Sequence, residues 1–489
     1  MVNKRIFFVS CFCVFATVVS AQTADMKSHN IQLSQKKVAE IVLKQSPSAD
    51  EINQKYLSYR LGLFSALGTY DWKLSAESGY EYDKSQSISF VNSSKYDRYR
   101  TTLNVGKSIA STGSNIGLEF SRLSQVAEIP TSLTSTIPTR GTLDIAGLTF
   151  EQNLLANSFG YADRASLAYS ELLFNSQMLG RADELQDLVL KALRQFWNTY
   201  VAQENFHESL ATRDRYKKLV DNVRRKASFG YSSPAELPQI LAEFENREQL
   251  VKTASLDYLK QLDDLLVLLN LPAGSEIQFE VPKDLPQVPQ LKEASLAELR
   301  SLKSQKMRVS AFEEQLKASK SKSYPTVNFV GKIYSTGEDQ DSEGSQSALF
   351  SGTHPKYYVG VKFQYNFGSD LQTEDIINKR VNLQIEKIKM DRLQRDRENA
   401  LGDSQRKVDA QYEVVKSLER QLQYRSQAVA DLNRTYNQGR TDLSLLIDAM
   451  NRHATTEIQL SRAVGDYQIA LNELAAKRDE LVKEEGGNL

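Results

Sequence analysis

Residues that could carry out chemistry are few in this sequence, and they are scattered. The four histidines, His29, His207, His354 and His453, are isolated, so they show neither the spacing of a metal site nor an evident base beside a nucleophile. The sequence also has no glycine-rich loop of the kind that cradles a phosphate. We therefore expect that the chain is not an enzyme and uses no cofactor and no metal.

The N-terminal segment has the pattern of a secretory signal peptide. Two basic residues precede an apolar run over residues 6–19, and a small-residue cleavage site follows, so we expect residues 1–21 to be removed. Both cysteines, Cys11 and Cys13, fall in this segment, which predicts a mature chain without disulfide or thiol chemistry. No later apolar run reaches the length of a spanning helix, so any membrane crossing must use β-strands.

Polarity and charge exclude two further classes of protein. The 489 residues include 61 basic and 61 acidic side chains, and the mean hydropathy is −0.45. The chain is too polar for a helical membrane protein, and its balanced charge gives no electrostatic reason to bind nucleic acid. We interpret the basic run Arg224-Arg225-Lys226 as a solvated helix face, so no nucleic acid partner is expected.

Two very long helices must organise the rest of the chain. Residues 160–228 and residues 370–438 each have one internal glycine and no proline, which leaves helix as the regular structure that fits. At about 1.5 Å per residue, each would be a rod of roughly 100 Å. In the second rod, apolar residues seven apart predict coiled-coil packing; they are Leu401, Val408, Val415, Leu422, Val429 and Tyr436.

Each rod ends at a glycine turn, and a shorter helix follows. The first turn is Phe229-Gly230-Tyr231-Ser232, and Ser233-Pro234-Ala235-Glu236 is a strong start signal for a helix that runs to about residue 270. The second turn surrounds Gly439 and leads into a helix over 442–485. The turn glycines lie 209 residues apart and the strand-to-rod junctions lie 208 apart, which indicates an internal duplication.

The expected domain organisation is therefore two tandem repeats. The first repeat covers residues 22–272 and the second covers 291–485, each with a helix before its strands, and 486–489 form a tail. Residues 273–290 are rich in proline and are expected to be a linker at the equator of the rods.

Segments of period two precede both rods and predict β-strands. We expect four strands in the first repeat and a pair in the second, over residues 71–90, 101–110, 115–123, 141–152 and 325–367. The pair in the second repeat is separated by a polar, acidic loop that contains Glu338 and Glu343. The alternation suits a transmembrane barrel strand, with lipid on one side and a watery lumen on the other, and it suits a half-buried strand of a soluble sheet equally well.

One chain has too few strands to close a membrane barrel by itself. The smallest membrane barrels have about eight strands, and an open sheet edge in lipid is not viable. If the strands span a membrane, several copies must pool them into one barrel, and the long striped helices must pool into a coiled-coil tube. The predicted fold class is a mixed membrane β-barrel plus a long α-helical coiled-coil barrel.

Four short motifs, in this order and spacing, carry a resemblance to a known family. They are Phe150–Leu155, Phe229-Gly230 to Gln239, Tyr365–Gly368, and Tyr436 to Gly439 followed by Leu446-Ile447-Asp448-Ala449. Over nearly all of its mature length, the chain resembles the outer-membrane efflux protein family typified by the TolC channel-tunnels. The family often has proline where Asn153 and Asn366 stand, which is a small departure.

The resemblance implies a homotrimer with 12 strands in the outer membrane of a Gram-negative bacterium and 12 helices in the periplasm. Such a channel-tunnel is the passive exit duct of a tripartite efflux or type I secretion system. Its partners would be a periplasmic adaptor (membrane fusion) protein, an inner-membrane pump of RND or ABC type, and outer-membrane lipid.

The first repeat departs from this pattern, because it has four candidate strands rather than two. The trimer would have 18 strands if all of them span the membrane, and 12 if the middle pair lies outside it. We favour the transmembrane extension, with Lys107 interrupting the alternation of Leu103, Val105 and Ile109.

The resemblance also implies a gate at the periplasmic tips of the helices. Family members narrow the tunnel with an Asp-x-x-Asp pair after the second turn; Asp448 matches the second aspartate, Leu445 stands at the first, and Asp442 could substitute. Asp442 could equally be only a helix-start residue, and Asp448 only a solvated coil position.

Three further residues complete the implied gate. Tyr436 matches a tyrosine that the family uses in the hydrogen bonds of the closed tip, although it could be only a heptad core residue. The matching basic residue is displaced by one position, to Arg440, and Glu236 takes the equivalent acidic place in the first repeat.

Two sets of surface residues follow from the same resemblance and from the strand alternation. The turns should dock the adaptor through Gly230, Tyr231, Ser232, Ser233, Gly439, Arg440 and Thr441, although each glycine could be a simple helix cap. The aromatics expected at the membrane interface are Trp72, Tyr80, Tyr82, Tyr357, Phe363 and Tyr365. The alternative from another class is a periplasmic coiled-coil adaptor or scaffold whose strands form a soluble domain.

Overall fold

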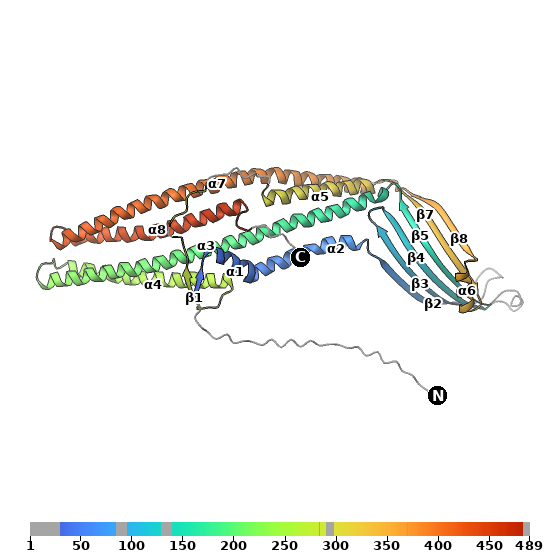
Figure 1. The fold of residues 1–489 in the computed structure, drawn as a ribbon, viewed down its shortest axis with the longest axis horizontal. Coiled ribbons are helices and arrows are strands. Elements are labelled where there is room, and N and C mark those ends of the chain that lie inside the picture. The colour runs from blue at the N-terminus through green and yellow to red at the C-terminus, as the bar shows by residue number, and fades with distance from the viewer. Residues whose placement is uncertain are drawn as a thin grey trace, which may run out of the picture.

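The structure is a computed structural model that describes residues 30–84, 95–128, 139–282, 284–289, 298–368 and 370–482. The predicted signal peptide, both cysteines and the predicted tail lie outside these residues. Figure 1 shows an elongated body of long helices with a β-sheet at one end. No helix within the described ranges is both long and apolar enough to cross a membrane.

Two helical hairpins form most of the body. α3 (Tyr161–Ser228) turns back into α4 (Glu236–Leu269), and α7 (Asp370–Asn437) turns back into α8 (Leu443–Lys477). α3 and α7 have 68 residues each, and they begin and end within one residue of the predicted rods. α8 stops at Lys477 rather than at 485, because Asp479 adopts a left-handed conformation that ends the helix.

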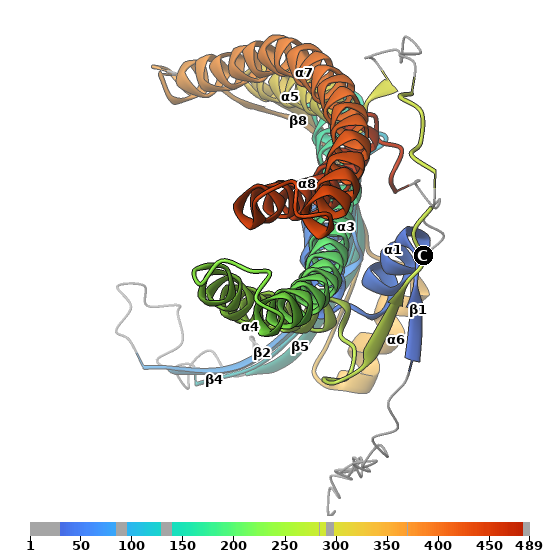
Figure 2. The ribbon, with the colours of Figure 1, turned by 90° about the vertical axis from the view of Figure 1, so that its left-hand side faces the viewer.

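The helices lie side by side in one curved wall. Next to the sheet, the order is α2 (Pro47–Gly68), α3, α5 (Arg300–Lys322) and α7; toward the tips it is α4, α3, α8 and α7. α1 (Gln35–Gln45) packs on α3 near the middle of the molecule. Figure 2, which looks along the wall from the tip end, shows its curvature and shows that α1 lies on the convex side.

The sheet has six antiparallel strands. In spatial order they are β2 (Lys73–Asp83), β3 (Lys95–Ile109), β4 (Ser114–Glu128), β5 (Arg140–Asn153), β7 (Thr326–Asp339) and β8 (Pro355–Gln364). β3 and β4 are joined at the helix end by a tight turn at Gly113, where a Cβ would lie 2.2 Å from the backbone nitrogen of Gly160. The middle pair of candidate strands is therefore an integral part of the sheet, wedged between β2 and β5.

The two faces of the sheet differ in chemistry. Register partners point to the same face of an antiparallel sheet, and one apolar row crosses all six strands: Leu74, Val105, Leu118, Leu148, Ile333 and Tyr357. The opposite face has charged residues that include Glu77, Arg100, Glu119, Lys332 and Lys362.

The apolar face is the convex one. The Ser335 hydroxyl, on the face of the apolar row, donates a 2.7 Å hydrogen bond to the Leu349 carbonyl of α6 (Ser342–Ser351). α6 lies on the convex side of the wall in Figure 2, so the apolar row is convex and the charged face is concave. The sequence did not predict α6, which occupies the expected acidic loop; the Asp341 side chain caps its first turn by accepting from the Gly344 backbone.

The predicted linker contains a second unpredicted element. β6 (Glu276–Phe279) pairs in parallel with β1 (Asn30–Leu33), and Ile277 and Phe279 pack on the largest apolar core. That core surrounds Phe196 and Trp197 of α3, both fully buried. Pro272 and Pro282 do not prevent this short strand, because both lie outside it and remove no N–H from the β1–β6 pairing.

Candidate functional site

The two hairpin tips have the same backbone structure. Gly230 and Gly439 have positive φ angles of 76° and 73°, which favour glycine. In each tip, the backbone N–H of the residue after the glycine donates to the backbone carbonyl five residues earlier. The Tyr231 N–H donates to the Lys226 carbonyl at 2.9 Å, and the Arg440 N–H donates to the Thr435 carbonyl at 3.0 Å. This is the Schellman motif, and it closes both helices in the same way.

A shared apolar core holds the two tips together. It is formed by the last turns of α3 and α7 and the first turns of α4 and α8, with Tyr216, Leu219, Val220, Val223, Ile240, Tyr436, Leu443, Leu446 and Ile447. Tyr436, expected either in the gate or in the heptad core, is buried here and so belongs to the core. Burial raises the pKa of the Tyr216 phenol to about 12.

A polar cluster lies beside this core and joins the two hairpins. The Tyr436 hydroxyl donates to Glu236 Oε2 of α4 at 3.1 Å, and the Ser232 hydroxyl donates to the same oxygen at 2.8 Å. Lys226 of α3 donates from Nζ to the Tyr436 carbonyl at 2.8 Å, and its ammonium lies 3.7 Å from the centre of the Tyr436 ring. The cluster therefore connects three of the four helices at the tip.

Electrostatics in the cluster follow from burial and from the nearby carboxylate. Burial, and then the Glu236 carboxylate, raise the pKa of the Tyr436 phenol well above its usual range. Burial lowers the pKa of the Lys226 amine. The phenol therefore stays a hydrogen-bond donor at any physiological pH.

Lys226 shows where the sequence interpretation was wrong. Arg224 and Arg225 are exposed, as expected for a solvated face, but Lys226 is half-buried against Tyr436. Lys226 lies one turn before Gly230, and its side chain reaches Tyr436 of the second hairpin, a contact that the run of like charges does not indicate.

The other predicted gate residues do not join this cluster. Asp448 is exposed and forms an ion pair with Arg452 of its own helix, 2.9 Å between oxygen and nitrogen. Asp442 is the exposed N-cap residue of α8, and Arg440 is exposed at the second turn. The structure thus brings Tyr436 and Glu236 together and leaves the other three on the solvent side of the tip.

The predicted docking turns are exposed, with different side chains at the two tips. Phe229 and Tyr231 flank Gly230 and are 72% and 83% exposed. Gln438 and Arg440 occupy the matching positions beside Gly439. Ser233 and Thr441 complete the two turns, and the Thr441 hydroxyl donates to Thr435 Oγ1 at 2.9 Å.

The histidines are not all isolated once the chain folds. His453 of α8 lies 3.3 Å from Glu457, whose carboxylate also accepts from Arg215 of α3 at 2.7 Å. His207 is exposed, and His354 contacts the Thr353 hydroxyl at the far end of the sheet. Within the described residues, no group of histidine, cysteine and acidic residues has the arrangement of a metal site.

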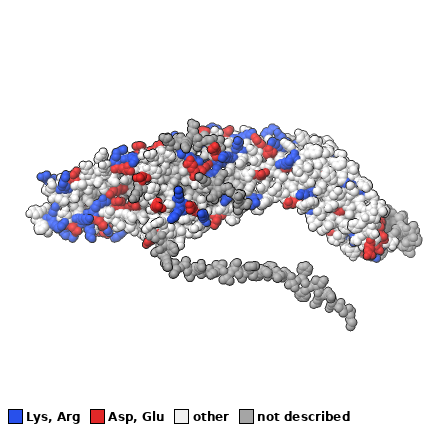
Figure 3. All heavy atoms as spheres, in the orientation of Figure 1, with Lys and Arg blue, Asp and Glu red and all other residues white. Residues whose placement is uncertain are grey.

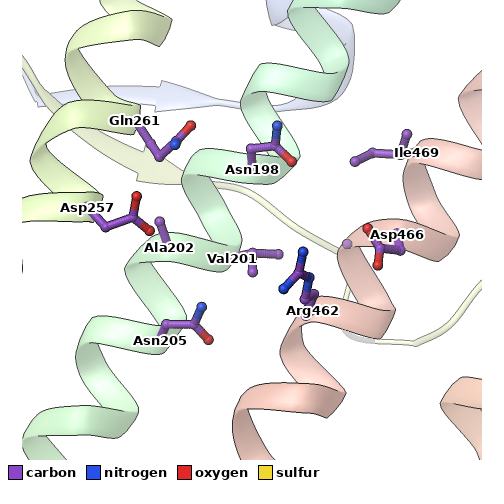
Figure 4. A pocket seen from close by; sticks show the side chains of 10 residues that line it. Asn198, Val201, Ala202, Asn205, Asp257, Gln261, Arg462, Asp466 and Ile469 are labelled. Atoms are coloured by element: carbon purple, nitrogen blue, oxygen red, sulfur yellow. The ribbon is translucent and has the colours of Figure 1, made fainter. Parts of the chain in front are cut away.

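A polar groove of about 250 Å³ lies along α3 between α4 and α8. Figure 4 shows Asn198 and Asn205 of α3 at its floor, Asp257 and Gln261 on the α4 side, and Arg462 and Asp466 on the α8 side. Acidic, basic and amide groups face the groove together. Such a lining suits hydrogen bonds to a helix or to water, and it contains no nucleophile beside a base.

The predicted interface aromatics lie on or next to the convex face of the sheet. Tyr80, Tyr82, Tyr357 and Phe363 all point to the face of the apolar row, Trp72 directly precedes β2, and Tyr365 follows β8. Figure 3 shows that charged side chains crowd the helical part and are sparse on the visible face of the sheet.

The sequence analysis did not predict an ion pair that lies on this same face, farther from the helices than the apolar row. Arg122 of β4 donates from two nitrogens to Asp144 of β5 at 2.7 and 2.9 Å, and the Ser345 hydroxyl of α6 donates to the same carboxylate at 2.8 Å. α6 thus covers a fully buried aspartate, and Gly337 lets the helix approach the sheet closely.

Solved structures similar to this chain include outer-membrane and channel proteins. CusC, described with transmembrane channel formation, has a TM-score of 0.70 at 12% identity and covers 97% of this chain and 98% of its own. The Campylobacter jejuni CmeC outer membrane channel has a TM-score of 0.68 at 11% identity, covering 93% of this chain and 87% of its own. The Vibrio cholerae outer membrane protein VceC has a TM-score of 0.66 at 11% identity, and the match covers 91% of this chain and 96% of VceC.

The chain has the fold of a TolC-like outer-membrane channel. No family model matches the sequence, and no curated protein matches it either. At 11–12% identity the likeness is one of fold, and it runs through both hairpins and the sheet because the coverage exceeds 90%. The predicted resemblance to the TolC-like family is confirmed at this level.

Proposed function

We propose that this chain is the outer-membrane channel-tunnel of a Gram-negative bacterium. Three copies form a passive exit duct for a tripartite efflux or type I secretion system, with the helices in the periplasm and a gate at their tips. The observation that carries the proposal is a curved wall with an apolar convex sheet face and two open edges.

The convex face of the sheet suits contact with lipid. Its apolar row is exposed in a single chain, with Leu74 at 69% and Tyr357 at 69%, and tyrosines follow it toward the far end of β2. The concave face carries charged residues, as the wall of a water-filled pore would. A soluble sheet would bury such a face against other elements, and in the described chain only α6 covers part of it.

The two edges of the wall call for neighbouring copies. β2 and β8 are the end strands of the described sheet, and each is bonded on one side only. An unpaired strand edge inside a membrane leaves backbone N–H and C=O groups without partners. Each such group costs on the order of several kcal/mol in hydrocarbon. β2 runs away from the helices and β8 runs back, so the edges of adjacent copies meet antiparallel.

The helical edges carry matching apolar stripes at the same level. α2 exposes Leu57, Leu61 and Phe64 between its middle and the sheet, and α7 exposes Ile377 and Val381 in its half nearest the sheet. Spacings of three and four residues place each set on one helix face. Three copies joined in this way would contribute 18 strands, six from each chain, rather than 12.

The tips supply the gate and the docking surface of the proposal. Tyr436, Glu236 and Lys226 hold the hairpins together, and the adaptor and the pump would shift the tips apart by favouring an open arrangement. Asp448, Asp442 and Arg440 face solvent, where they would set the charge of the entrance. The exposed turns at Gly230 and Gly439 would bind the adaptor.

Membrane extraction tests the proposal as a whole. The protein should fractionate with outer membranes, need detergent for release, and migrate on gels as a heat-modifiable trimer. Release as a soluble monomer by osmotic shock alone would instead identify the periplasmic scaffold and contradict the channel.

Single-channel conductance tests the gate. Asp448→Ala should raise conductance in planar bilayers and lower cation selectivity, because it removes a carboxylate from the entrance. Asp403→Ala is the matched control, since Asp403 also pairs with a nearby arginine of its own helix, Arg406, but lies in the middle of α7. Unchanged conductance and selectivity in Asp448→Ala would remove this residue from the gate.

A further inference from the structure

α6 folds back over the convex face of the sheet. β7 runs away from the helices to Asp339, and α6 then returns along the outside of β7 and β5 before β8 begins at Pro355. Near the start of α6, a Cβ on Gly344 would lie 2.3 Å from the Asp339 carboxyl carbon. Near its end, the Leu349 carbonyl accepts from the Ser335 hydroxyl at 2.7 Å. The end of α6 is therefore closer to the helical body than its start.

The polarity of α6 changes along this direction. Its first turn contains Glu343 and is capped by the Asp341 side chain. Its last turn contains Leu349, which is buried, and Phe350, which is 83% exposed. The polar end of α6 thus lies farthest from the helical body, and the apolar end lies nearest the apolar row.

Aromatic residues of the sheet mark two levels on the convex face. Tyr80 lies six residues beyond Leu74 of the apolar row, and Phe363 lies six residues from Tyr357 on the helix side of the row. Six residues at about 3.3 Å each, on strands tilted by about 40°, correspond to about 15 Å along the membrane normal. The apolar band of a membrane barrel is about 25 Å tall, with aromatic residues at both of its borders. The two levels therefore match the two borders of a membrane centred near the apolar row.

The sheet completes the outer aromatic level only in part. The ring of Tyr80 lies 4.8 Å from that of Tyr99 on β3, measured between their centres. Farther along the same row, the next three strands have polar residues, namely Ser124, Thr142 and Asp339. α6 packs on β5 and β7, where the sheet has no aromatic residue at this level. Phe350 supplies an exposed aromatic ring in this sector.

α6 also covers charges on the convex face. Arg122 and Asp144 lie four residues beyond the apolar row, which is about 10 Å along the membrane normal and inside the apolar band. Asp144 is fully buried and accepts from the Ser345 hydroxyl of α6 at 2.8 Å. Gly337 lies opposite Asp144 in the register, and a Cβ there would be 2.0 Å from the Ser345 carbonyl oxygen. The sheet thus leaves room for α6 where it separates an ion pair from the surroundings.

We propose that α6 is an interfacial helix in the outer leaflet of the membrane, and that its partner is lipid at the boundary between headgroups and acyl chains. Phe350 enters the acyl chains, Glu343 lies among the headgroups, and Ser345 seals the ion pair beneath the helix. Helices with an apolar side lie at this boundary because they bury that side in the outer part of the acyl region. This inference rests on the proposed function and specifies how the outer border of each sheet meets the lipid.

Spin labels measure the position of α6 directly. Both cysteines of the sequence lie in the predicted signal peptide, so an introduced cysteine would be labelled alone in the mature chain. A nitroxide on Phe350→Cys, in the full-length protein reconstituted into phospholipid vesicles, should collide more often with oxygen, which partitions into lipid, than with a water-soluble nickel chelate. Its oxygen-to-nickel collision ratio should be about fivefold that of a label on Glu343→Cys, at the polar end of the same helix.

Two controls calibrate this ratio. A label on Leu118→Cys, in the apolar row, should report lipid, and a label on Lys332→Cys, on the concave face, should report water. A ratio at position 350 equal to that at 332, with position 118 in lipid, would overturn the placement of α6 and leave the channel intact. Protection of position 350 from both reagents would also overturn it, because protein rather than lipid would cover the helix. Water access at position 118 would contradict the proposed function as well.

Substitution of Phe350 gives a second readout. Phe350→Asp should lower the temperature at which the trimer dissociates in vesicles, because it places a carboxylate among acyl chains. Phe350→Trp should leave this temperature unchanged, since tryptophan suits the membrane interface. Phe229→Asp is the matched control, because Phe229 is also a highly exposed phenylalanine but lies in the first tip turn. No fall in Phe350→Asp, or an equal fall in the control, would contradict the contact of α6 with lipid.

Discussion

The two long helices are equal in length and differ in their surroundings. α3 packs along α1, α2, α4, α5 and α8 and has seventeen buried residues. α7 packs along α5 and α8, meets α3 and α4 at the tip, and has five buried residues. Two proline-free helices of 68 residues thus serve as the centre of the wall in one case and as its border in the other.

The difference lies in how much of the apolar pattern of α7 one chain covers. Val408 and Val415 of its heptad row are buried against α8, as the pattern predicts. Ile385 and Ile388 are exposed although they are as apolar as the core of α3. In the proposed trimer, the neighbouring copy would cover these residues at the border of the wall.

The largest expected effect on stability distinguishes α3, at the centre of the helical wall, from α7, at its border. Phe196→Ala should lower the free energy of unfolding by about 3–5 kcal/mol, since the ring is fully buried against Trp197 and Phe279. Val381→Ala, half exposed on α7, should cost less than about 0.5 kcal/mol within one chain and should instead lower the dissociation temperature of the trimer. Chemical denaturation followed by circular dichroism, with native gels for the trimer, distinguishes the two effects. Equal losses in the free energy of unfolding for the two variants would contradict the placement of α7 at the border of the wall.

The next effect concerns a polar group that α3 buries. Burial, and then the neighbouring Asp479, raise the pKa of Asp183 to about 6 even though Arg300 lies 3.3 Å away. The folded state therefore holds this proton between about pH 4 and 6, where the unfolded chain has lost it, so stability should fall as pH rises through that window. Asp183→Asn should remove this fall, worth about 2 kcal/mol or less. A pH profile of unfolding that keeps its slope in the variant would contradict the assignment.

A smaller effect tests the link between the hairpins. Tyr436→Phe removes the hydrogen bond to the Glu236 carboxylate and should cost about 1–2 kcal/mol. Glu236→Ala should lower the free energy of unfolding by at least as much, and the double variant should cost less than the sum, because both substitutions break the same contact. Conductance in planar bilayers should rise in all three variants. Full additivity would mean that the two residues act separately.

The smallest effect compares the internal glycines of the two helices. At Gly402 of α7, a Cβ would meet only the end of the flexible Arg406 side chain, so Gly402→Ala should stabilise by about 0.5–1 kcal/mol. At Gly180 of α3, it would lie 3.2 Å from the Tyr56 hydroxyl, which is bonded to Glu184. Gly180→Ala should therefore gain little or lose stability. Thermal melts would contradict the comparison if both alanines stabilised equally.

Much of the fold could be predicted because its signals are local. The lack of proline defined both long helices, and a two-residue period defined the strands. β6 could not be found in this way, since its pairing with β1 depends on chain segments far apart. α6 was missed because its serine-rich sequence has a weak apolar period, and its stability comes from Asp341 at the cap and from packing on Gly337.

The candidate site was predictable only in part. Tyr436 and Glu236 could be named from turn spacing and resemblance, and the structure joins them. Lys226 was hidden in a basic run. His453 and Glu457 stand four residues apart on α8, so their contact could have been predicted from that spacing. Side chains whose roles depend on the neighbouring hairpin leave no pattern within their own segment.

The inserted hairpin of β3 and β4 changes how strands and helices fit at their junction. Strands spaced about 4.8 Å and tilted about 40° each span roughly 6 Å of circumference, so six take up about 38 Å, and four would take up about 25 Å. Four helices at 8–10 Å spacing take up about 32–40 Å. In the proposed trimer, the extra pair, which brings no helix with it, would let the sheet continue the helical cylinder at nearly constant bore, so a cargo that clears the tips would meet no second bottleneck on its way out.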